Sequence, residues 1–96
     1  MPYEPQGYMH VYQSYCVRLR SPKSQAEVMS AMADRGVATR RIIAAHEQPF
    51  YKELYPDLCL PESEIASSRT LLLPMFVGLT DAEQDEVVDA LREALN

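Results

Sequence analysis

Hydrophobic and polar residues alternate along the chain from Met9 to Arg20. One face carries Met9, Val11, Gln13, Tyr15, Val17 and Leu19, and the other carries His10, Tyr12, Ser14, Cys16, Arg18 and Arg20. A period of two with aromatic and β-branched residues predicts a strand, which Ser21-Pro22 ends. Residues 1–8 hold two prolines and a glycine without periodicity, so we expect an extended lead-in.

Two segments have helical spacing and begin at a capping box. Ser24 stands three residues before Glu27, and Thr80 three residues before Glu83. In such a pair each side chain accepts a hydrogen bond from the other residue's backbone N–H. Apolar stripes follow both boxes, formed by Val28, Met29 and Met32, and by Val87, Val88, Leu91 and Leu95. The spacing predicts helices over 24–35 and 81–95, and Gly36 suits the left-handed position after the first.

The middle of the chain predicts shorter elements. We expect a strand over 37–43, a loop over 44–49 and one helical turn over 50–55. Pro61 suits a first helical position, and a helix over 62–70 follows. Leu71-Leu72-Leu73 indicates a buried strand that Pro74 closes.

This order of elements predicts an α+β fold. It is a small three-stranded sheet with helices packed on one face, and residues 9–96 form a single domain. The chain has 96 residues, of which 47% are hydrophobic and 24% charged, an ordinary globular balance. The sequence lacks an apolar run long enough for a membrane span and has no secretory-signal pattern.

Charge and cysteine usage narrow the function classes. Nine Lys and Arg face fourteen Asp and Glu, which gives a net charge of −5. This acidic balance argues against binding to nucleic acid and suits a cytoplasmic protein. We expect Cys16 and Cys59 to be reduced and buried. With His10 and His46 as the only imidazoles, the sequence predicts no metal site.

The densest chemistry lies between residues 36 and 51. Arg40 and Arg41 end a predicted strand, and His46 follows in a loop, an arrangement that suits an anionic, hydroxyl-rich ligand. The alternative is that both arginines pair with surface acids and His46 caps a turn. The sequence has no glycine-rich phosphate loop and no catalytic triad pattern.

Four segments occur in an order that resembles a known family. They are HVYQSYCVRL at 10–19, AEVMSAMADRGVATRR at 26–41, AAHEQPFYKEL at 44–54 and SSRTLLLPMFVGLTDAEQDEVVDALREAL at 67–95. The most specific parts are an H-x-x-P-x-Y motif, at His46, Pro49 and Tyr51, and the LPMF-x-GLT-x-x-EQ-x-x-VV run at 73–88. Together they resemble the C-terminal small domain of the DegT/DnrJ/EryC1/StrS family of sugar aminotransferases, which use pyridoxal phosphate (PLP).

The resemblance implies a parent reaction in which an amino group, usually from glutamate, passes to a keto-sugar on a nucleotide carrier. The family's large N-terminal domain carries the Schiff-base lysine and most PLP contacts. The resemblance therefore implies a small domain that is non-catalytic alone, without catalytic or PLP-binding residues of its own. It assigns substrate binding to His46, with Arg40 as a second candidate. We then expect His46 to be exposed beside Arg40 or Arg41; the alternative buries the imidazole against a backbone carbonyl.

The partners implied are a large PLP-binding domain, if it is encoded separately, and a second copy in a homodimer or small oligomer. A different function is a free-standing interaction module that kept this fold and binds a protein through the face that the large domain would cover. A third is a sensor of an anionic sugar near Arg40 and His46. The candidate residues of the uncovered face are Tyr3, Tyr8, Tyr12, Ile42, Ile43 and Phe50.

Overall fold

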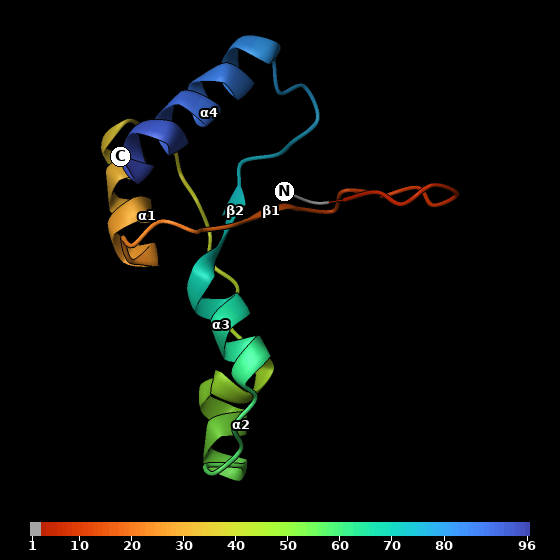
Figure 1. Ribbon diagram of the computed structural model, residues 1–96, viewed down its shortest axis with the longest axis vertical. Coiled ribbons are helices and arrows are strands. Elements are labelled where there is room, and N and C mark those ends of the chain that lie inside the picture. The colour runs from red at the N-terminus through yellow and green to blue at the C-terminus, as the bar shows by residue number, and fades with distance from the viewer. Residues whose placement is uncertain (1–2) are drawn as a thin grey trace.

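The computed structural model describes residues 3–96 and has an α+β fold (Figure 1). In chain order the elements are β1 (Tyr15–Arg18), α1 (Gln25–Asp34), the 3₁₀ helix η1 (Ala45–Glu47), α2 (Pro49–Leu54), α3 (Pro61–Arg69), β2 (Thr70–Leu73) and α4 (Asp81–Leu95). The helices α1 and α4 lie together at one end of the molecule, and α2 and α3 extend toward the other end. The described residues contain no helix that is both long and apolar enough to cross a membrane.

The sheet has two strands, not the predicted three. β1 and β2 pair antiparallel, with Tyr15 opposite Leu73 and Arg18 opposite Thr70. The 37–43 segment adds only an isolated bridge, in which Arg40 N donates to Leu72 O at 3.1 Å and Leu72 N to Arg40 O at 2.8 Å. Beyond Arg40 the backbone leaves the sheet, because the Ser67 side chain binds Ile42 O and Ala44 N.

The first strand is also shorter than predicted. Residues 9–14 are exposed and lie outside the sheet, although their side chains alternate. The partner strand explains this, because β2 ends at Leu73 and the next residue, Pro74, has no backbone N–H to donate. Tyr12 adds a left-handed backbone angle, with φ of 48°, which a regular strand does not contain.

Both helices predicted from capping boxes are confirmed. Ser24 Oγ accepts from Glu27 N at 3.2 Å and Glu27 Oε2 from Ser24 N at 2.7 Å. Hydrogen bonds from Ser24, first from its backbone N–H and then from its side chain, lower the pKa of the Glu27 carboxyl. Gly36 has φ of 79° and closes α1, with Gly36 N donating to Ala33 O and Val37 N to Met32 O. Thr80 and Glu83 form the second box, at the start of α4.

The hydrophobic core lies between α1, α4 and the sheet. Val28 and Met32 of α1 and Leu71 of β2 are fully buried. The α4 residues in the core are Ala90 and Ala94, one turn apart, whose small side chains let the two helices approach closely. The larger α4 residues predicted as its apolar stripe lie at the rim: Val87, Leu91 and Leu95 are half-buried and Val88 is exposed.

The chain is less compact than a closed globule of its size. Its accessible surface is 7488 Å², whereas a compact monomer of this mass exposes about 5,600 Å². Its radius of gyration is 15.4 Å, against about 12.5 Å expected. The exposed large hydrophobic residues lie mostly in the N-terminal arm, in 42–60 and in 75–77.

The caps offer a direct test of α1. Replacing Ser24→Ala removes the acceptor for Glu27 N and should lower the free energy of unfolding by about 0.5–2 kcal/mol. The matched control is Ser30→Ala, an exposed position inside the same helix, where alanine is the better helix former. Urea unfolding measures both variants. An equal loss of stability in the two would contradict the role assigned to the cap.

Candidate functional site

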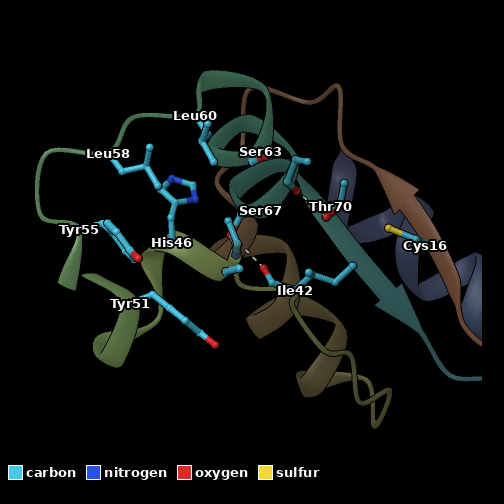
Figure 2. A pocket seen from close by; sticks show the side chains of 13 residues that line it. Cys16, Ile42, His46, Tyr51, Tyr55, Leu58, Leu60, Ser63, Ser67 and Thr70 are labelled. Atoms are coloured by element: carbon cyan, nitrogen blue, oxygen red, sulfur yellow. Dashed lines mark hydrogen bonds between the residues drawn. The ribbon is translucent and has the colours of Figure 1, made fainter. Parts of the chain in front are cut away.

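A hollow of about 530 Å³ opens between η1, α3 and the loop that follows α2 (Figure 2). Its lining is mostly apolar: Cys16, Ile42, Ala44, Ala45, His46, Tyr51, Tyr55, Leu58, Leu60, Ser63, Ala66, Ser67 and Thr70. This is the largest hollow described in residues 3–96. A concave, largely apolar surface with a few polar groups is the usual form of a small-molecule or partner site.

His46 lies in the wall of this hollow and is buried, with only 9% of the residue exposed. The predicted exposed position is therefore wrong. The reason is local structure: residues 45–47 form a 3₁₀ turn, which the sequence did not predict, and the turn directs the imidazole toward α3. The alternative is confirmed for the burial but not for the carbonyl partner, since within residues 3–96 His46 Nε2 is buried without a hydrogen-bond partner.

Glu64 of α3 is the polar group nearest to that nitrogen. Its Oε1 lies 3.5 Å from His46 Nε2, and its Oε2 accepts a hydrogen bond from the Cys59 thiol at 3.5 Å. This bond, together with the carboxylate charge, raises the pKa of the Cys59 thiol. Both cysteines are free, as predicted, but Cys59 is exposed and Cys16 half-buried, so their predicted burial is wrong.

Ser67 fixes the backbone next to the hollow. Its hydroxyl donates to Ile42 O at 3.0 Å and accepts from Ala44 N at 3.3 Å, and only 3% of the residue is exposed. On the other side, Gln25 Nε2 donates to Ser67 O at 2.9 Å. Nothing in the sequence indicates this role of Ser67, because a serine inside a polar helix is ordinary until its long-range partners are known.

Arg40 lines a different hollow from His46. The Arg40 backbone is held by Leu72, and its exposed side chain lines a separate hollow with Ala38, Leu72 and Phe76. Arg41 is exposed as well. No hollow described in residues 3–96 contains His46 together with either arginine, so the predicted placement of His46 beside Arg40 or Arg41 in one site remains a prediction.

The H-x-x-P-x-Y motif has a clear structural basis. His46 lies in η1, and Pro49 begins α2 at the first helical position, where its missing N–H costs nothing. Tyr51, in the first turn of α2, lines the same hollow as His46. The spacing of the motif thus places an imidazole and a phenol in one site (Figure 2).

The comparison with protein families agrees with the motifs. The sequence model of the DegT/DnrJ/EryC1/StrS aminotransferase family matches residues 1–92 of this 96-residue chain. The chain belongs to that family. The DegT/DnrJ/EryC1/StrS family is PLP-dependent, and a PLP enzyme needs a lysine that binds the cofactor.

The lysines of this DegT/DnrJ/EryC1/StrS chain do not fit PLP. A Schiff-base lysine needs an amine that is held neutral in an enclosed pocket. Lys23 is half-buried, but its Nζ donates to the carbonyls of Ala94 and Asn96 at the end of α4. Lys52 is exposed on α2, and neither lysine lines a described hollow. No step of a PLP reaction is assigned to these residues.

Substitutions of Ser67 and Ser68 in α3 test whether Ser67 holds the 42–44 segment beside the hollow. Ser67→Ala should lower the free energy of unfolding by about 1–3 kcal/mol, because Ile42 O and Ala44 N lose their partner. Ser68→Ala, at the exposed neighbouring position, should change it by less than about 0.5 kcal/mol. Urea unfolding and hydrogen exchange at the Ala44 amide measure the difference. Similar stability and exchange in both variants would show that Ser67 does not hold the 42–44 segment.

Proposed function

We propose that these residues form the small domain of a PLP-dependent nucleotide-sugar aminotransferase of the DegT/DnrJ/EryC1/StrS type and are not catalytic alone. The observation that carries the proposal is that a chain matched over residues 1–92 by this family presents no enclosed lysine. Chemistry on PLP then requires a lysine from a separate large domain.

The exposed apolar surface supports docking to such a domain. Ile42 and Ile43 are 45% and 44% exposed, and Phe50 is 66% exposed. Interfaces between domains of one chain typically bury about 600–1,500 Å² in total, roughly half of it on each side. The surface exposed beyond that of a compact monomer is larger than one such half-interface. A docked domain would remove part of it from water.

Substrate contact is proposed for His46 and, second, for Arg40. His46 shares its hollow with Tyr51. The Arg40 side chain is exposed while its backbone is fixed by Leu72, so it is available to an anionic group. Because the two residues line different hollows, we propose that they contact different parts of a substrate.

The expected lack of catalytic activity is tested by adding PLP to the purified chain. We expect no stoichiometric aldimine absorbance and no transaminase turnover, since the Lys23 amine is bound to carbonyls and Lys52 is solvated. Lys23→Arg and Lys52→Arg serve as matched variants. A stoichiometric aldimine that one of the two variants abolishes would overturn the proposal.

The second candidate function is a free-standing module that binds a protein, including its own copy, through the same surface. The exposure of Ile42, Ile43 and Phe50 favours it. Closed two-fold dimers are the commonest way to cover such a patch. We then expect a dimer or small oligomer at micromolar concentration.

Sedimentation velocity measures that association. Replacing Ile42, Ile43 and Phe50 together by serine should shift the protein toward monomer, because the apolar area at the contact is lost. Val77→Ser is the control, since Val77 is fully exposed on a different segment. A wild-type protein that stays monomeric would rule out self-association through this face.

A further inference from the structure

We propose that His46, Glu47 and Glu64 form a binding site for a divalent transition-metal cation of the zinc class. One ligand atom from each residue lies within 4.8 Å of the others. Imidazole nitrogen and carboxylate oxygen are ordinary ligands of such ions. The inference does not depend on the family assignment, but a metal ion on His46 would take the place of the substrate contact proposed for that side chain.

The separation of the two best-placed atoms fits a shared ion. His46 Nε2 and Glu64 Oε1 are 3.5 Å apart, which is long for a direct hydrogen bond between imidazole and carboxylate. Two ligands of a tetrahedral ion, each about 2.1 Å from the metal, lie about 3.4 Å apart. The observed gap therefore matches the spacing of two ligands around one metal.

The burial of His46 is an independent observation that points to a missing partner. Its side chain is 6% exposed, and within residues 3–96 Nε2 has no hydrogen-bond partner. A buried polar atom left unpaired is costly, so native proteins rarely keep one. A metal ion at this nitrogen would satisfy it.

Charge supports a cation at the same place. Glu47 and Glu64 are half-buried carboxylates on two different elements, η1 and α3. Among residues 3–96 no lysine or arginine forms an ion pair with either one. Two carboxylates beside the imidazole then leave a negative site that a divalent ion would neutralise.

The scaffold holds these ligands in place. Ser67, one turn after Glu64 on α3, binds the backbone on both sides of Ile43, directly before η1. Three protein ligands leave at least one position for water, as in open zinc sites. This proposal departs from the sequence-based expectation of no metal site, which did not foresee that His46 and Glu64, 18 positions apart, lie close together.

Calorimetric titration of the full chain with zinc chloride tests the proposal. We expect one ion per chain and a rise in melting temperature in zinc, because the ion binds the folded state. Glu64→Gln, which removes a charged ligand at constant size, should weaken zinc binding by at least about tenfold. The control Glu62→Gln, exposed near the start of the same helix, should bind as the wild type does.

Two further variants complete the test. Cys59→Ser should retain binding; its loss would show that the thiol holds the metal and would overturn the site. His46→Gln should lose binding, and if this variant fails to fold by circular dichroism, Glu47→Gln replaces it. Absence of zinc binding, or equal affinity in Glu64→Gln and Glu62→Gln, would leave a direct pair between the imidazole and the carboxylate as the correct description.

Discussion

The junction between α3 and β2 is the constraint on which the rest of the structure depends. The Arg69 guanidinium donates to Leu19 O at 3.2 Å, to Lys23 O at 2.9 Å and to Ser21 O. It thereby satisfies the carbonyls of the turn that connects the sheet to α1. Hydrogen bonds from a charged donor are stronger than neutral ones, and here one side chain makes three of them. Gln25 adds bonds to Ser67 O and Thr70 O from the first residue of α1.

The same junction links the core to the candidate site. Leu71, one residue into β2, is fully buried in the core, whereas Ser67, four residues earlier, holds the backbone beside His46. One continuous stretch of chain thus contributes to both ends of the molecule. The helix α3 projects away from α1 and α4, and in residues 3–96 this junction is what holds it to the core (Figure 1). The hollow forms where η1 and the loop after α2 return along that helix.

The features predicted from the sequence are those that depend on near neighbours. Both capping boxes, the glycine after α1 and the proline at the start of α3 involve residues within a few positions of one another. The predicted length of the first strand was wrong because the extent of a strand depends on its distant partner. Here that partner is β2, which has four residues and ends before a proline. The predicted exposure of His46 failed for a local reason, since residues 45–47 form a 3₁₀ turn that directs the imidazole toward Glu64 on α3. The motif at His46, Pro49 and Tyr51 still places two of its side chains in one hollow, because the motif is local.

The exposed apolar surface and the buried, unpaired Nε2 of His46 are both energetically unfavourable, but they require different partners. Exposed apolar area, such as Phe50 on α2, is satisfied by any well-fitting apolar surface, because the hydrophobic effect has no direction. An unpaired Nε2 is satisfied only by a donor, an acceptor or an ion in one direction. A docked large domain would cover the exposed apolar surface. It would not need to reach His46 Nε2, because Leu58 and Leu60 line the hollow together with His46. The two requirements are therefore separable: in the functions proposed above, the apolar surface would select the docking partner, whereas His46, Glu47 and Glu64 would bind a separate ion.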